Sequence, residues 1–236
     1  MLAAPRITST NRWHLTRVVW IAELCLIPLS NNVVALIQWQ TNIDLYPVLA
    51  ATLYTYIAIR HLRTLPFGFV WSGRSIGLGA AAGLALALPA IIFFVHPVLV
   101  GEVNYGPIAT LSVNGLLHRL LVDLPFLTAI FEELVFRHWL FFETASPART
   151  VTLNASIFTV WHGVAGFTAV AATQFGGSAG LLLLSYIGSL AAVFVGGVIF
   201  ALVRLKTGSF VYAALTHWLS DAAIVMVIWI MGHLAH

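Results

Sequence analysis

The chain has 236 residues, of which 60% are hydrophobic and only 8% are charged. Soluble domains carry roughly 25% charged residues, so this composition excludes a soluble enzyme. The formal net charge of +3 does not indicate nucleic-acid binding, because the basic residues lie at the ends of apolar segments. We expect an all-α, polytopic integral membrane helix bundle that forms one membrane-embedded domain over residues 1–236. We expect it to contact the lipid bilayer and not to bind nucleic acid.

Seven apolar segments approach or exceed the length that spans a bilayer. We therefore predict about seven transmembrane helices, within a range of six to eight. In chain order they cover residues 17–39, 44–59, 75–100, 114–143, 151–173, 181–203 and 209–232. The first contains Pro28, Asn31 and Asn32, so we expect it to be broken or partly re-entrant. Gly79 and Gly83 have the spacing of a close helix contact, although glycine is common in membrane helices generally.

The basic residues predict the orientation. With a cytoplasmic N-terminus, nine of the eleven Lys and Arg residues fall in cytoplasmic segments: Arg6, Arg12, Arg17, Arg60, Arg63, Arg74, Arg149, Arg204 and Lys206. Asp44 and Glu102 then lie outside. This is the positive-inside distribution of membrane proteins. The short loops are typical of a bacterial protein, and we predict a location in the bacterial cytoplasmic membrane.

The fourth segment carries charged residues where charge is unfavourable. Glu132, Glu133 and Arg137 lie within the apolar stretch from Leu120 to Phe142. Each such charge costs roughly 2.5–3.5 kcal/mol even on lenient insertion scales. Glu133 precedes Arg137 by four residues, which is the favourable order for an ion pair. That pair, which taken alone is more often structural than catalytic, would leave Glu132 free for chemistry.

Two later segments each carry a histidine among apolar residues. His162 lies in the fifth segment, one helical turn after Phe158, and His217 lies in the seventh, on one face with Asp221. At 1.5 Å per residue, Glu132, His162 and His217 lie about 18, 16 and 14 Å from the cytoplasmic side. We therefore expect these side chains to meet around one hydrated point.

These residue types favour hydrolysis by an activated water. A carboxylate in a low-dielectric cavity suits a general base near neutral pH, and histidine can hold water, stabilise an oxyanion or bind a metal. We find no serine, threonine or cysteine in a nucleophile motif and no HExxH pair. A divalent metal such as zinc, held by Glu132, His162 and His217, is an alternative that the sequence leaves open.

Together these motifs resemble the CPBP family, which comprises the CAAX proteases and bacteriocin-processing enzymes and is also called Abi. The motifs span residues 120–221 within a core of about 114–232: Glu132-Glu133-x-x-x-Arg137, Phe158-x-x-x-His162 and His217-x-x-x-Asp221. The resemblance implies an intramembrane endopeptidase, of the glutamate or the metallo type, that hydrolyses a peptide bond in a membrane-associated peptide or protein.

The resemblance also implies a role for each motif residue. Glu132 would activate the attacking water, and His162 would share it. His217 and Asp221 would stabilise the oxyanion. The two remaining residues of the first motif would position the catalytic glutamate: Glu133 and Arg137.

The chain departs from the family pattern at two positions. His138 stands where glycine is common, and Asp221 stands where asparagine is frequent. An ionised aspartate cannot donate a hydrogen bond to an oxyanion, so Asp221 would have to be protonated, orient His217 or bind a metal. Two other function classes stay open: a non-catalytic immunity or scaffolding protein of this fold, and an ion-coupled transporter. The transporter is less favoured, because we find none of the inverted repeats expected for it.

Overall fold

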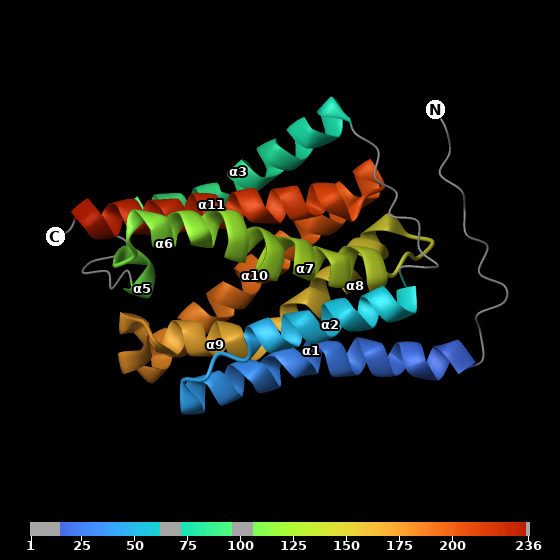
Figure 1. The fold of residues 1–236 in the computed structure, drawn as a ribbon, viewed down its shortest axis with the longest axis horizontal. Helices are drawn as coiled ribbons and strands as arrows, with labels where there is room; N and C mark the ends of the chain where they lie inside the picture. Colours follow the sequence, from blue (N-terminus) through green and yellow to red (C-terminus); the bar gives the residue numbers. More distant parts are fainter. Residues whose placement is uncertain (1–14, 62–71, 96–105, 235–236) are drawn as a thin grey trace.

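The computed structural model describes residues 15–61, 72–95 and 106–234, and every regular element in these ranges is a helix (Figure 1). The α-helices are α1 (Leu15–Thr41), α2 (Tyr46–His61), α3 (Gly73–Val95), α5 (Gly106–Ala109), α6 (Val113–His118), α7 (Ile130–Glu133), α8 (Pro147–Trp161), α9 (Gly163–Ala171), α10 (Ala179–Thr207) and α11 (Phe210–Leu234). The predicted all-α class is therefore confirmed for these residues.

The described helices suit a bilayer in both length and surface. Four are long and apolar enough to cross a membrane, within α1, α3, α10 and α11, and a shorter apolar helix covers Tyr46–Ile59. Large apolar side chains face outward, among them Leu26 at 64% and Leu184 at 68% exposure. Lipid favours such a surface, whereas water does not. The chain is an integral membrane protein.

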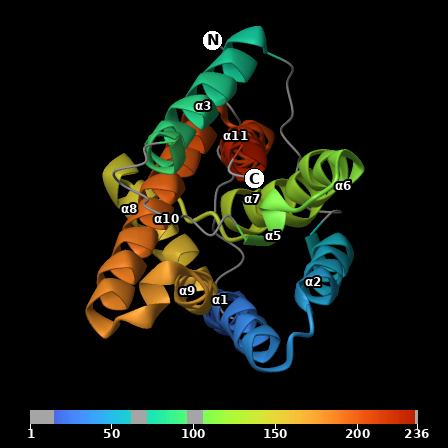
Figure 2. The same ribbon diagram turned by 90° about the vertical axis from the view of Figure 1, so that its left-hand side faces the viewer.

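The long helical segments run in alternating directions along the bundle (Figure 1). Seen along its long axis, α1 and α2 lie on one side, and α3 and α11 lie on the opposite side (Figure 2). The span count of about seven and the cytoplasmic N-terminus stay predictions. Arg6, Arg12 and Arg63, which carry part of the orientation argument, lie outside the described residues.

The predicted fourth segment is helical but changes its winding. Wide π-type turns, η1 (Arg119–Ala129) and η2 (Leu134–Trp139), flank the four residues of α7. The Ile130 amide donates to the Pro125 carbonyl, and the Leu140 amide donates to the Val135 carbonyl at 2.8 Å, each spanning five residues. Such turns are rare and are frequent at functional sites. The helix ends at Trp139 instead of reaching residue 143.

The segment predicted to span the membrane over residues 151–173 is not one continuous helix, because the helix is broken at His162. His162 adopts φ −91° and ψ 3°, and it separates α8 from α9. Its amide donates to the Thr159 carbonyl at 3.1 Å, which tightens the last turn of α8. A break of this kind removes backbone hydrogen bonds from the groups on either side of it.

The break expected in the first segment is also wrong, because α1 continues through Pro28. The two asparagines that suggested it donate to carbonyls of α8, and Asn32 also donates to the Pro28 carbonyl within α1 at 2.8 Å. The Asn31 side-chain amide donates to the Trp161 carbonyl at 2.8 Å, and that of Asn32 donates to the Val160 carbonyl at 2.8 Å. Within a membrane, irregular backbone is tolerated only where protein or water satisfies it, and α1 supplies those partners.

The glycine pair of the third segment makes the close helix contact that its spacing indicated. A Cβ on Gly83 would lie 2.5 Å from the Thr216 carbonyl oxygen, and one on Gly79 would lie 3.0 Å from that of Tyr212. The Thr216 hydroxyl donates to the Gly79 carbonyl at 3.0 Å. The missing side chains therefore allow α3 to pack directly on α11, one residue before His217.

Candidate active site

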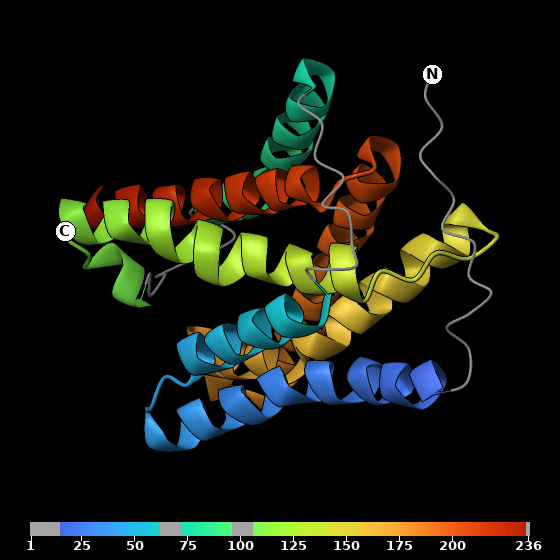
Figure 3. The ribbon, with the colours of Figure 1, turned by 45° about the vertical axis from the view of Figure 1, so that its right-hand side comes forward.

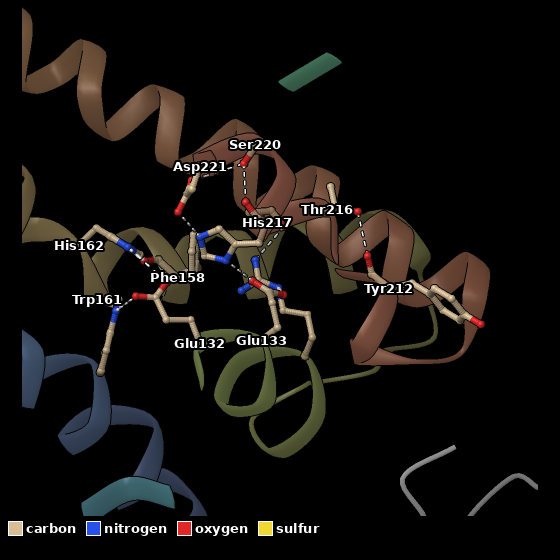
Figure 4. A network of polar contacts seen from close by, with 12 residues as sticks. Glu132, Glu133, Phe158, Trp161, His162, Tyr212, Thr216, His217, Ser220 and Asp221 are labelled. Atoms are coloured by element: carbon tan, nitrogen blue, oxygen red, sulfur yellow. Dashed lines mark hydrogen bonds and ion pairs between the residues drawn. The ribbon is translucent and has the colours of Figure 1, made fainter. Parts of the chain in front are cut away.

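Six residues predicted from the sequence come together in one cluster, and Figure 4 labels all of them except Arg137. They are contributed by α7, η2, the α8–α9 break and α11: Glu132, Glu133, Arg137, His162, His217 and Asp221. The Phe158 ring packs against both histidines, with ring centroids 4.5 Å from His162 and 6.1 Å from His217. Three separate helical segments thus present their polar groups to one another.

Glu133 is fully buried between two basic partners. Its Oε2 lies 3.1 Å from Arg137 Nε, which is the pair predicted from the spacing of four residues. Its Oε1 lies 3.1 Å from His217 Nδ1. A buried carboxylate needs such compensation, because an unpaired charge in the interior is strongly destabilising. Glu133 is engaged through both oxygens.

Arg137 anchors the neighbouring helices. Its side chain is fully buried, Nη2 donates to the Gly197 carbonyl at 3.2 Å, and Cζ lies 4.3 Å from the Phe158 ring centroid. The ring face attracts the guanidinium as a cation–π contact. A Cβ on Gly197 would lie 3.0 Å from Ala155 Cα, so glycine lets α10 approach α8 at this point.

Glu132 has a different environment from its neighbour. Its Oε1 accepts hydrogen bonds from the Tyr46 hydroxyl at 2.8 Å and from Trp161 Nε1 at 3.2 Å. Its Oε2 has no hydrogen-bond partner among the described residues and lies 3.6 Å from His162 Nε2. One carboxylate oxygen is therefore fixed, and the other faces the histidine.

The backbone contact of His162 determines which ring nitrogen can accept a proton. Nδ1 lies 2.9 Å from the Phe158 carbonyl oxygen, which can only accept, so Nδ1 carries the hydrogen. In the neutral ring Nε2 is then an acceptor. His162 Nε2 and Glu132 Oε2 are two acceptors that face each other, an arrangement that suits a molecule able to donate to both. The His162 side chain is 22% exposed.

His217 is held between two carboxylates. Its Nδ1 faces Glu133, and its Nε2 lies 3.3 Å from Asp221 Oδ2. Because carboxylate oxygens accept hydrogen bonds, these contacts favour a proton on each ring nitrogen. The ring stacks on Phe200 with centroids 4.6 Å apart. Of the roles considered for Asp221, orientation of His217 fits this contact.

The residues considered for a metal do not fit one as they lie. With a proton on each ring nitrogen, as its two carboxylate contacts favour, His217 has no lone pair to offer a metal ion. Within residues 15–61, 72–95 and 106–234, no group of three His, Cys, Asp or Glu side chains is arranged to hold one. We therefore derive no step through a metal.

Sequence reasoning missed Tyr46 and Trp161, which both donate to Glu132. A buried tyrosine hydroxyl or tryptophan N–H usually has a hydrogen-bond partner, and the position of Trp161 directly before His162 was the available signal. His138, which stands where glycine is common in the family pattern, packs against the start of α11. Its ring centroid lies 5.2 Å from that of Phe210.

A second group of charged side chains lies apart from the cluster. Asp123 contacts Arg119 at 3.5 Å and His118 at 3.4 Å, and the three border a surface hollow of about 510 Å³. None of the residues that line this hollow belongs to the Glu132 cluster. We therefore build the chemistry on the cluster.

Comparison with known families agrees with the motifs. The family model described as type II CAAX prenyl endopeptidase Rce1-like matches residues 114–223. This range covers just under half of the chain and contains all six predicted site residues, whereas α1, α2 and α3 precede it. No curated protein and no solved structure gives a significant match. The match confirms the resemblance found from the three motifs.

Proposed function

We propose that the chain, whose residues 114–223 match the Rce1-like type II CAAX prenyl endopeptidase family model, is an intramembrane endopeptidase in which Glu132 activates a water molecule. Membership of this family implies a peptide hydrolase with a peptide or protein substrate in a membrane. The observation that carries the finer proposal is the facing pair of acceptors, Glu132 Oε2 and His162 Nε2, 3.6 Å apart. From the compact chain and its short loops we further propose a bacterial cytoplasmic membrane.

The first step is attack of water on the scissile carbonyl. A water between the two acceptors donates one hydrogen to Glu132 Oε2 and the other to His162 Nε2, so its lone pairs point away from both. As the water oxygen bonds to the carbonyl carbon, Glu132 takes its proton and the carbonyl electron pair moves to oxygen. The donors Tyr46 and Trp161 hold Oε1, which keeps Oε2 directed at the water.

The second step is collapse of the tetrahedral intermediate. The oxyanion needs a hydrogen-bond donor, and His217 Nε2–H supplies one when the oxyanion replaces Asp221 as its acceptor. The carbon–nitrogen bond then breaks, and Glu132 returns the proton to the leaving amine. The products are a carboxylic acid and an amine, and the base is regenerated. Glu133 and Arg137 hold His217 and the helix in place.

The substrate reaches the cluster from its more exposed side. The Asp221 side chain is 31% exposed and that of His162 is 22% exposed, whereas Glu133 and Arg137 are sealed. The description of the matched family and the membrane location suggest two substrate classes. One is a prenylated C-terminal peptide, and the other is a peptide tethered by an apolar helix.

The test uses two internally quenched peptides and the full chain in lipid nanodiscs. The prenyl probe carries a farnesyl-cysteine followed by three residues, and the anchored probe carries the same sequence on an apolar helix without farnesyl. We expect cleavage of at least one probe and a loss of about 10³-fold in Glu132→Gln, since general-base catalysis contributes about 10²–10⁴-fold.

Glu23→Gln is the matched control, because this carboxylate on α1 accepts from the Tyr56 hydroxyl at 2.7 Å and lies outside the cluster. It should cleave at the unaltered rate. Full activity of Glu132→Gln, or no cleavage of either probe by the unaltered chain, would refute the proposal. The second of these results is the behaviour of a non-catalytic immunity or scaffolding protein.

A further inference from the structure

Two helices outside the family match contact both sides of the facing pair. Figure 3 shows α1 and α2 along one side of the bundle, and both precede residue 114. We propose that Tyr46 on α2 and Asn31 and Asn32 on α1 are positioning residues, which together fix the separation of Glu132 Oε2 from His162 Nε2. The inference rests on the proposed function and extends the machinery to a part of the chain that the motifs do not reach.

Tyr46 determines which oxygen of Glu132 is available. Its hydroxyl donates to Oε1 at 2.8 Å, and its ring packs edge-on against Phe131, the residue before Glu132, with centroids 6.0 Å apart. Its amide donates to Asp44 Oδ1 at 3.0 Å, which fixes the start of α2. The carboxylate cannot rotate without losing the hydrogen bonds of Oε1. Oε2 is therefore held toward His162.

The asparagine pair holds the helix break that presents His162. The Asn32 amide donates to the Val160 carbonyl at 2.8 Å, and its oxygen accepts from the Val164 amide at 2.6 Å. Asn31 donates to the Trp161 carbonyl at 2.8 Å. These three backbone groups flank the break, where a continuous helix would have bonded them internally.

Both halves of the facing pair are thus tied to one hairpin. Residues 42–45 are the whole connection between α1 and α2. A displacement of the hairpin changes the position of Glu132 through Tyr46 and that of His162 through the asparagines. A change of a few tenths of an ångström there alters how one water bridges the two acceptors, because catalysis depends on such alignment.

Two tyrosines of α2 provide a matched comparison. Tyr46 and Tyr54 both pack on Phe131, with ring centroids 6.0 and 5.3 Å away, and both donate their hydroxyl to the helix that carries Glu132. Tyr46 donates to the carboxylate, whereas Tyr54 donates to the Phe126 carbonyl at 2.6 Å. Tyr46→Phe and Tyr54→Phe each remove one hydroxyl hydrogen bond between the same two helical segments, and only Tyr46→Phe removes it from the carboxylate.

We expect Tyr46→Phe to lower kcat about tenfold with KM within about twofold, because a hydrogen bond to a charged group contributes that much. Tyr54→Phe should leave both constants within about twofold. The substrate is whichever of the prenyl and anchored probes the unaltered chain cleaves. Rates are expressed per folded molecule, with folding measured by size-exclusion chromatography and thermal unfolding.

Asn32→Ala tests the second contact, with Ser30→Ala as its control, because Ser30 Oγ donates within α1 to the Ile27 carbonyl at 2.7 Å. We expect a several-fold fall in kcat for Asn32→Ala alone. Unchanged kcat in Tyr46→Phe and Asn32→Ala, or an equal fall in each control, overturns the inference. If Glu132→Gln stays active, the proposed function fails. If Glu132→Gln is inactive and the kcat of Tyr46→Phe equals that of Tyr54→Phe, the proposed function stands and only this inference fails.

Discussion

Glu132 and Glu133 are adjacent in sequence and both buried, yet they have different partners. Glu133 faces a basic side chain at each oxygen, Arg137 on one side and His217 on the other. Glu132 has two neutral aromatic donors on one oxygen and His162 opposite the other. The same chemical group has a basic partner at each oxygen in one case, and in the other it has one oxygen without a hydrogen-bond partner among the described residues. The proposed roles of the two glutamates rest on this difference in partners.

Burial separates the two sites in the same way. The Glu133 and Arg137 side chains are completely sealed, whereas His162 beside Glu132 keeps 22% of its side chain exposed. A fully buried ion pair suits a structural role, since its two partners stay together in the folded protein. A partly open site suits chemistry, because water and substrate must enter. Each prediction below tests this division.

Exchange of each glutamate for glutamine should give opposite results. Glu132→Gln removes the base, so activity falls about 10³-fold while the thermal midpoint changes little. Glu133→Gln leaves the buried Arg137 without its counter-charge, which costs about 3–5 kcal/mol of stability. Thermal unfolding and probe cleavage, measured on both variants, give the two quantities. An equal loss of stability in Glu132→Gln and Glu133→Gln would contradict the assignment of a catalytic role to one glutamate and a structural role to the other.

Added bulk at Gly83 should disturb the Glu133 side through α11. A Cβ there would lie 2.5 Å from the Thr216 carbonyl oxygen, so Gly83→Ala forces α11 away from α3 and costs about 1–3 kcal/mol. Gly77→Ala is the control, because apart from its chain neighbours and the backbone of its own helix no described atom lies within 4 Å of its added Cβ. Thermal unfolding measures both. A stable Gly83→Ala would mean that the helices separate freely at this contact.

Asp221→Asn should have a smaller effect. If Asp221 orients His217, an amide oxygen can accept from Nε2 in its place, and kcat should stay within about threefold. Asp221→Leu removes the acceptor and should lower kcat about tenfold. The cleavage rate of each variant, per folded molecule, decides the matter. Equal inactivity of the two variants would show that the negative charge itself is required.

Much of the site could be predicted because local spacing determines it. The Glu133–Arg137 and His217–Asp221 contacts follow from a separation of four residues, and both are present. The packing of Phe158 on His162 follows from the same spacing. Helical periodicity fixes such neighbours whatever the rest of the chain does.

The features that were not predicted depend on residues distant in sequence. The break at His162 has no proline to signal it, and its carbonyls are satisfied by Asn31 and Asn32 about 130 residues away. Those asparagines suggested a break in their own helix because their partners were unknown. Tyr46 likewise gains its role through Glu132, 86 residues away. Hydropathy and periodicity carry no information on such pairings.

The smallest effect is expected from metal removal. His217 would have to release a carboxylate before it could bind a metal ion, so chelation by 1,10-phenanthroline should change the cleavage rate by no more than about twofold. The measurement is probe cleavage before and after chelation, with the metal content of the purified chain determined in parallel. Loss of activity that zinc restores would contradict this prediction. It would mean that Glu132, His162 and His217 rearrange around a metal, and that His217 binds the metal instead of donating a hydrogen bond to the oxyanion.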